Sequence, residues 1–133
     1  MKELEKYFKG LADPNRLRII NLLLHSELCG CDIQYVLDAS QPNVSRHLTY
    51  LKNAGLVLDR RDGFRIFYRL AEPRKATRRE LFEFLRFAFK DDDTLRQDIE
   101  QLKQAIKGGG CTVSEWRPYS GLTKLRTSPS TQA

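Results

Sequence analysis

The chain has 133 residues, 41% of them apolar and 30% charged, which is typical of one compact globular domain and excludes a fibrous or wholly disordered protein. No stretch approaches the roughly 20 apolar residues of a membrane span, and the first residues include acids, so we expect a cytoplasmic protein rather than a secreted one. The net charge of +6 is concentrated, because residues 41–79 hold ten Lys and Arg against three Asp and Glu, as in a phosphate-binding surface.

Two helices are predicted at the N-terminus. Apolar side chains recur at helical spacing from Leu4 to Leu11, which indicates a short amphipathic helix. Asp13 followed by Pro14 is typical of a helix start, because proline at the first helical position has no N–H to leave unsatisfied. The second helix then continues to about His25.

The segment from Cys29 to Leu56 predicts a helix, a tight turn and a second helix. Asp38-Ala39-Ser40 forms the turn, and Pro42 prevents one continuous helix through this region. Gly55 ends the second helix.

Residues 56–70 change to the period of strands. Asp62-Gly63 lies between two runs of β-branched, aromatic and basic residues, which indicates a β-hairpin. After Pro73, helical spacing returns from Leu81 to Phe89.

A last helix is predicted from the apolar stripe between Leu95 and Ile106, after the acidic run 91–93. This stripe either covers the domain's own core or pairs with the same helix of a second subunit. Pairing is favoured, because two-fold readers of DNA place matched half-sites about one helical turn apart. The composition then becomes rich in Gly, Ser, Thr and Pro, which predicts a domain of residues 1–107 and a flexible tail, 108–133, that carries Cys111.

The predicted fold is therefore mainly α with a β-hairpin wing, a winged helix-turn-helix that dimerises through terminal helices. One face of the second helix of the pair is polar and suits base edges and phosphates, and the basic hairpin suits the DNA backbone. Each of these residues alone could be a solvated surface residue, and His47 could be packed at the core edge; their combination indicates DNA binding. The candidate DNA contacts are Gln41, Asn43, Ser45, Arg46, His47, Thr49 and Tyr50 on the helix and Arg60, Arg61 and Arg65 on the wing.

Segments 11–19, 27–33, 41–57 and 60–70 resemble, in order, the motifs of the ArsR family of metal-responsive winged-helix repressors. The resemblance covers about half of the chain. It implies a homodimer that binds double-stranded operator DNA and blocks transcription until an inducer lowers its affinity.

Two cysteines, Cys29 and Cys31, stand where a helix begins. Ser or Thr would cap a helix well at Cys29, so a thiol there indicates chemistry rather than capping, and a helix N-terminus favours the thiolate. Residues two apart on an intact helix point to opposite sides, so joint binding of one ion is expected to unwind the first turn, which Gly30 makes easy. An odd number of cysteines without a secretory signal also predicts reduced thiols.

The segment 27–32 resembles the thiolate box of arsenic, antimony, cadmium and lead sensors in the family. That resemblance implies As(III) or Sb(III) as inducer; thiolates also suit Cd(II), Pb(II) or Zn(II), and a thiol-redox switch is a further alternative. Arsenic sensors often have a third cysteine where this chain has Gln34, which makes Cys111 the candidate third ligand. No His follows His47, so the family's zinc site on the C-terminal helix is not expected.

Other classes of protein fit the residues less well. An enzyme is not expected, because no nucleophile with a base and no pair of catalytic carboxylates can be placed. A basic protein-interaction module is the alternative from a different class, and steep salt dependence of duplex binding would distinguish the two.

Overall fold

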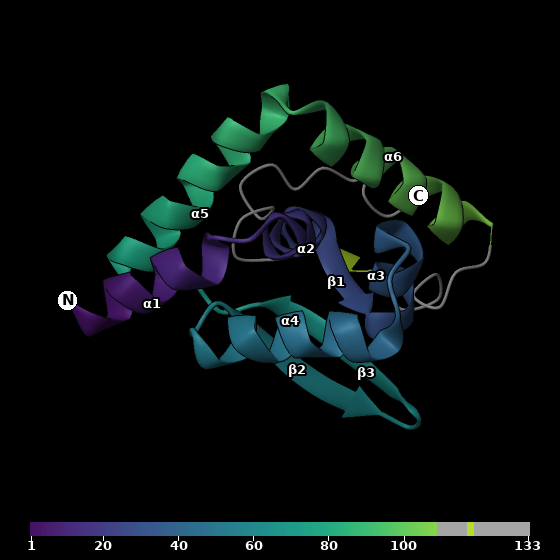
Figure 1. Cartoon of the computed structure of the whole chain (residues 1–133), viewed down its shortest axis with the longest axis horizontal. Coiled ribbons are helices and arrows are strands. Elements are labelled where there is room, and N and C mark those ends of the chain that lie inside the picture. The colour runs from purple at the N-terminus through teal and green to yellow at the C-terminus, as the bar shows by residue number, and fades with distance from the viewer. Residues whose placement is uncertain (109–116, 119–133) are drawn as a thin grey trace.

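The computed structural model describes residues 1–108 and 117–118 of the chain. Helix α2 lies at the centre, α1 lies near the start of α5 on one side, and α6 crosses the opposite side (Figure 1). None of the described helices combines the length and the apolar character that a membrane span needs. The elements are α1 (Lys2–Leu11), α2 (Pro14–His25), β1 (Ser26–Cys29), α3 (Gly30–Leu37), α4 (Gln41–Asn53), β2 (Val57–Asp62), β3 (Arg65–Leu70), α5 (Ala76–Ala88), the 3₁₀ turn η1 (Phe89–Asp91), α6 (Asp93–Lys107) and β4 (Arg117–Pro118).

Side-chain oxygen atoms cap the starts of three helices. The Asp13 carboxylate accepts hydrogen bonds from the backbone N–H groups of Asn15 and Arg16, at 2.8 and 3.1 Å, and begins α2 as predicted. Ser40 caps α4 and Asp92 caps α6 in the same way. The helix-turn-helix and its turn at residues 38–40 are thus confirmed, with Asp38 in the left-handed region at φ 54°.

The hairpin is also confirmed, with its turn one residue further along than the Asp62-Gly63 signal suggests. Asp62 still pairs with Arg65, so the two loop residues are Gly63 and Phe64. Gly63 has φ +67°, and a positive φ at the first loop position is the pattern of a type II′ turn, which requires glycine there.

The sheet contains a strand that the sequence pattern did not reveal. The strand order is β2-β3-β1-β4, and β1 pairs antiparallel with β3. All four residues of β1 are buried, so the strand lacks the alternation of apolar and polar residues by which a half-exposed strand is recognised.

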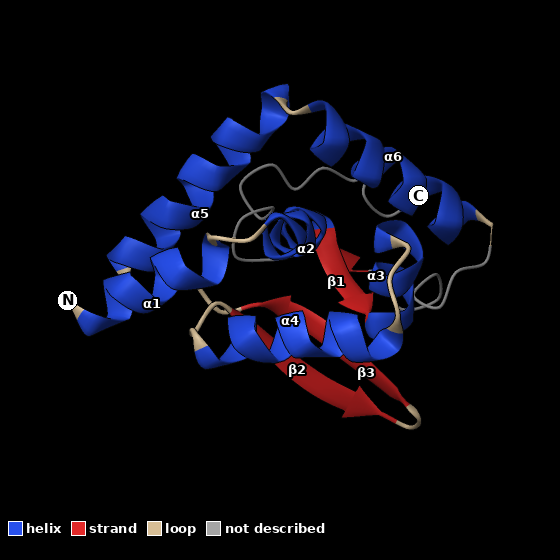
Figure 2. Cartoon of the chain, viewed as in Figure 1, coloured by secondary structure: helices blue, strands red, loops and turns tan. Residues whose placement is uncertain are grey.

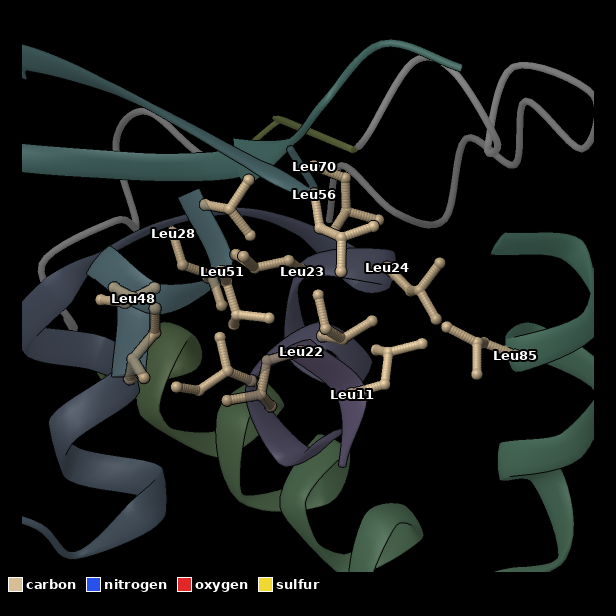
Figure 3. Close-up of a cluster of buried hydrophobic side chains, with 14 of the residues drawn as sticks. Leu11, Leu22, Leu23, Leu24, Leu28, Leu48, Leu51, Leu56, Leu70 and Leu85 are labelled. Carbon is tan, nitrogen blue, oxygen red and sulfur yellow. The ribbon is translucent and has the colours of Figure 1, made fainter. Parts of the chain in front are cut away.

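Leucines from the helices and strands form the core around α2. Leu22 and Leu23 of α2, Leu51 of α4 and Leu70 of β3 are fully buried. Figure 3 shows these side chains converging from their separate elements. The core therefore holds α4 and the hairpin in one rigid arrangement.

Helix α6 packs on the core of its own chain. Leu95 and Leu102 of its apolar stripe are buried, and Ile99 and Ile106 pack against the same core. The stripe is thus covered within the chain, where α6 contacts α2 and α3. This is the less favoured of the two expectations for this helix.

A salt bridge fastens α6 to α2. Arg18 donates hydrogen bonds from Nε and Nη2 to the two carboxylate oxygens of Asp98, at 2.7 and 2.9 Å, and the Asp98 side chain is 5% exposed. The hydrogen bond to Asp98 raises the pKa of Arg18. Asn21 adds an amide hydrogen bond to the Leu95 carbonyl at 3.0 Å.

We expect Asp98→Ala to lower the free energy of unfolding by roughly 2 to 3 kcal/mol, because it leaves the Arg18 guanidinium partly buried without its partner. Urea denaturation followed by circular dichroism measures this change. Glu100→Ala, an exposed carboxylate on the same helix, is the control and should change stability by no more than about 0.5 kcal/mol. Equal effects of the two substitutions would contradict the docking role of the salt bridge.

Candidate DNA-binding surface and thiol site

Helix α4 presents one apolar and one polar face, as predicted. Val44, Leu48 and Leu51 are buried against the core, at 2, 2 and 0% exposure. The opposite face carries the predicted contact residues, of which Gln41, Arg46, Thr49 and Tyr50 are exposed and Asn43, Ser45 and His47 are half-buried. Their positions fit base and phosphate contact, which stays a prediction.

Two of these side chains are already oriented by a neighbour. Arg46 donates a hydrogen bond from Nη2 to the Asn43 Oδ1 at 2.6 Å. This bond holds both groups on one side of the helix. An oriented Arg and Asn pair suits readout of guanine and adenine edges.

Arg16 of α2 is a residue of this surface that the sequence did not single out. Its guanidinium lies over the Tyr50 ring, 4.0 Å from the centroid, and its Nη1 is 3.4 Å from Nδ1 of His47. Arg16 Nε also donates to the Gly10 carbonyl at 2.8 Å. His47 and Tyr50 are therefore packed against α2 as well as facing outward, and only the three-dimensional contact reveals it.

The wing carries its basic residues on both sides of the turn. Figure 2 shows the turn of the β2–β3 hairpin at the lower edge of the molecule, away from the helices. Arg61 and Arg65 are exposed beside it, as a phosphate contact requires. Phe64 at the tip is fully exposed, a feature that the sequence left unassigned although an aromatic residue in a hairpin loop is a visible signal.

Arg60 differs from its neighbours on the wing. It donates hydrogen bonds to both carboxylate oxygens of Glu27, at 2.8 and 3.0 Å, and its side chain is 34% exposed. Its guanidinium also lies 4.6 Å from the centroid of the Phe67 ring. Arg60, a predicted phosphate contact, is thus held against the sheet by strand β1.

The two cysteines of the thiol site lie side by side. Cys29 ends β1 and caps α3, and its sulfur accepts a hydrogen bond from the Cys31 backbone N–H at 3.4 Å. The two Sγ atoms are 3.0 Å apart. The expectation that they point to opposite sides is wrong, because Cys29 has extended backbone angles, φ −71° and ψ 149°, and only Cys31 belongs to the helix.

This arrangement fits a soft ion without unwinding the helix. Two sulfurs bound at about 2.3 Å to one ion lie roughly 3 to 4 Å apart, close to the separation found here. Among the residues that the structure describes, no group of three or more His, Cys, Asp or Glu side chains could hold a metal ion. Cys111, the predicted third ligand, lies outside the described residues.

The two cysteines differ in exposure. Cys29 is a free, buried thiol, whereas Cys31 is half-buried. That the Cys31 thiol is reduced stays a prediction. Near this site, burial raises the pKa of Tyr68 on β3, with a further contribution from Asp59.

The fold and this surface define the class of protein: a winged helix-turn-helix. Residues 13–58 match the model of the bacterial regulatory protein, arsR family. The chain is 42% identical over 110 residues to the arsenical resistance operon repressor of Staphylococcus xylosus, covering 83% of this chain and 89% of that protein. The chain belongs to the ArsR family, whose members are DNA-binding transcriptional regulators and not enzymes.

Other relatives match over shorter segments. The arsenical resistance operon repressor of Escherichia coli K12 is 52% identical over 65 residues, 48% of this chain and 56% of that protein. The cadmium resistance regulatory protein CadC of Listeria innocua is 46% identical over 63 residues, 47% of this chain and 53% of that protein. The chain thus spans about half the length of these two curated relatives.

Solved structures share the architecture. HlyU from Vibrio cholerae has a TM-score of 0.59 and 29% identity, covering 65% of this chain and 91% of that one. A homodimeric winged helix-turn-helix DNA-binding domain from Mycobacterium bovis has a TM-score of 0.57 and 30% identity, covering 65% of this chain and 77% of that one. The predicted winged helix-turn-helix fold is confirmed.

Proposed function

We propose that the protein is a cytoplasmic, homodimeric repressor that binds operator DNA and is released when a soft ion binds at Cys29 and Cys31. The observation that carries the proposal is the adjacency of the two sulfurs, 3.0 Å apart, at the start of the helix that packs against α4. Membership of the ArsR family supports the DNA-binding part.

In this proposal α4 lies in the major groove. Arg46 and Asn43 contact base edges together with Gln41, Thr49 and Tyr50. Ser45 and His47, on the sides of the helix, contact phosphates, while Arg61 and Arg65 hold the backbone from the wing. Arg60 contributes less to DNA binding than Arg61 and Arg65 in this proposal, since Glu27 already pairs with its guanidinium.

Arg61→Ala and Arg65→Ala are each expected to weaken operator binding and to reduce the slope of log K against log salt by about 0.9, the effect of one lost phosphate contact. Fluorescence anisotropy with operator duplex at several salt concentrations measures the slope. Lys107→Ala, an exposed cation at the end of α6, should leave it unchanged. A wild-type protein that ignores duplex DNA at low salt would contradict the proposal and favour the protein-interaction module.

A second copy of the chain is the proposed occupant of an apolar face on α1 and α5. Leu4 and Phe8 on α1 and Phe84 and Phe87 on α5 are 39, 58, 60 and 72% exposed. The two helices adjoin, since Lys75 at the start of α5 pairs with Glu3 of α1 at 3.0 Å. The four exposed apolar side chains thus lie on two helices that meet at this ion pair, and the similar domain from Mycobacterium bovis is homodimeric.

Phe8→Glu is expected to weaken the dimer by about 30-fold or more, because it places a charge at the centre of an apolar interface. Analytical ultracentrifugation measures the dissociation constant. Phe64→Glu is the matched control, since Phe64 is also exposed but lies at the tip of the wing, and it should leave the dimer intact. An unchanged mass for Phe8→Glu would place the interface elsewhere.

The ion that we propose is As(III) or Sb(III), with Cd(II), Pb(II) or Zn(II) as alternatives. Thiolates are soft ligands, and relatives are named as arsenical and cadmium resistance regulators. Residues 1–107 form the domain in this proposal, and 108–133 form a tail whose Cys111 supplies the third thiolate. A thiol-redox switch acting at the same place is one further alternative, because the two sulfurs are 3.0 Å apart.

Cys29→Ser and Cys31→Ser are expected to keep operator affinity within about threefold of the wild type and to abolish release by arsenite. Serine caps a helix well, so the Cys29 variant should fold. Titration of the fully reduced protein–DNA complex with arsenite, antimonite, cadmium, lead, zinc and an oxidant measures release and identifies the inducer.

Cys111→Ser tests the third ligand separately. Loss of release in this variant is the expected result, whereas full release would leave a two-thiolate site. If the Cys29→Ser, Cys31→Ser double variant still responded normally, the inducer site would lie elsewhere.

A further inference from the structure

The thiol site and the wing share one row of residues across the sheet. Cys29 on β1 is the register partner of Phe67 on β3, and Phe67 is the register partner of Arg60 on β2. Directly opposed residues of antiparallel strands point to the same face. The Cys29 side chain, the Phe67 ring and the Arg60 side chain therefore lie next to one another on that face.

Glu27 on strand β1 lies next to this row of residues. It precedes Cys29 by two positions, so both side chains point to the same face of the sheet. Arg60 crosses the Phe67 ring, 4.6 Å from its centroid, and donates two hydrogen bonds to the Glu27 carboxylate. Phe67 is fully buried, and the Glu27 side chain is 8% exposed.

The pairing of the Arg60 guanidinium with the Glu27 carboxylate is stiff and directional. Two parallel N–H to O bonds between a guanidinium and a carboxylate fix the orientation of both groups, and the ring beneath limits their sliding. A shift of strand β1 at Cys29 is thus passed to β2 by two routes, the backbone pairing with β3 and the Glu27–Arg60 pair.

We propose that Glu27 is a positioning residue that couples the thiol site to the wing, by holding Arg60 over Phe67 so that ligation at Cys29 displaces the hairpin. This inference rests on the proposed function, because it concerns how binding at Cys29 lowers operator affinity. Glu27 itself touches neither the ion nor the DNA.

Glu27→Gln tests the coupling, because the amide keeps the size of the side chain and removes the negative charge that pairs with Arg60. The quantity measured is the ratio of operator dissociation constants with and without arsenite, on the fully reduced full-length chain. We expect this ratio to fall at least tenfold from the wild-type value. Protection of thiols by arsenite from a thiol-reactive dye should stay at the wild-type level.

The matched control is Asp59→Asn on the same strand β2. Asp59 also forms an ion pair, with Lys52 at 2.9 Å, but this pair joins β2 to α4 and not to β1. The control removes the same charge and should keep the wild-type ratio. A merely structural role of Glu27 would change thermal stability without changing the ratio.

The outcomes separate the coupling from the function on which it rests. If folded Glu27→Gln keeps the wild-type ratio of dissociation constants, the coupling alone is overturned. Loss of thiol protection in this variant also overturns the coupling, because it would place Glu27 at the ion site itself. A wild-type protein that keeps its operator in arsenite overturns the proposed function and the coupling with it. Should Glu27→Gln not fold, Glu27→Asp, which keeps the charge and shortens the reach, decides by the same ratio.

Discussion

Strand β1 ends and helix α3 begins at Cys29, and this junction fixes the wing relative to the helix-turn-helix. The residue pairs with Phe67 in the sheet and caps α3 with its sulfur. Helix α3 in turn packs on α4, the helix with the polar face. The two surfaces proposed to contact DNA are therefore connected through one buried thiol.

Some of the basic residues in 41–79 face outward, and others form ion pairs within the protein. Arg46, Arg61 and Arg65 face outward, whereas Arg60 is paired with a buried carboxylate. Arg16 and Arg18, which precede this segment, are also used inside the protein, against Tyr50 and Asp98. Net charge thus indicates the side proposed to face DNA, but the structure shows that several of the guanidinium groups also have partners inside the protein.

The fold was predictable because its signals are local. The Asp13-Pro14 start, the Pro42 break and the Gly63 turn each act through the backbone conformation of a few neighbouring residues, and each lies where expected within one residue. Strand β1 was not predictable, since all four of its residues are buried and no alternation marks it.

The site was predictable in composition and not in geometry. The polar face of α4 and the pair of cysteines follow from helical spacing and a capping position. The contacts of Glu27 and Arg16, at 33 and 31 residues' separation from Arg60 and His47, depend on tertiary structure. The placement of α6 was misjudged for a related reason, because the Arg18–Asp98 pair that holds it spans 80 residues.

The cap at Cys29 bears on how a ligand at this site can act. Sulfur is a weak acceptor, so the hydrogen bond from the Cys31 N–H stabilises the first turn of α3 only slightly. A Cys29 thiolate that held an ion would share its lone pairs between that N–H and the ion. Because the two sulfurs are already adjacent, joint ligation would require little movement of Cys31. A displacement on ligation would then fall on Cys29 and strand β1, the side of the junction that Phe67 and Glu27 connect to the wing.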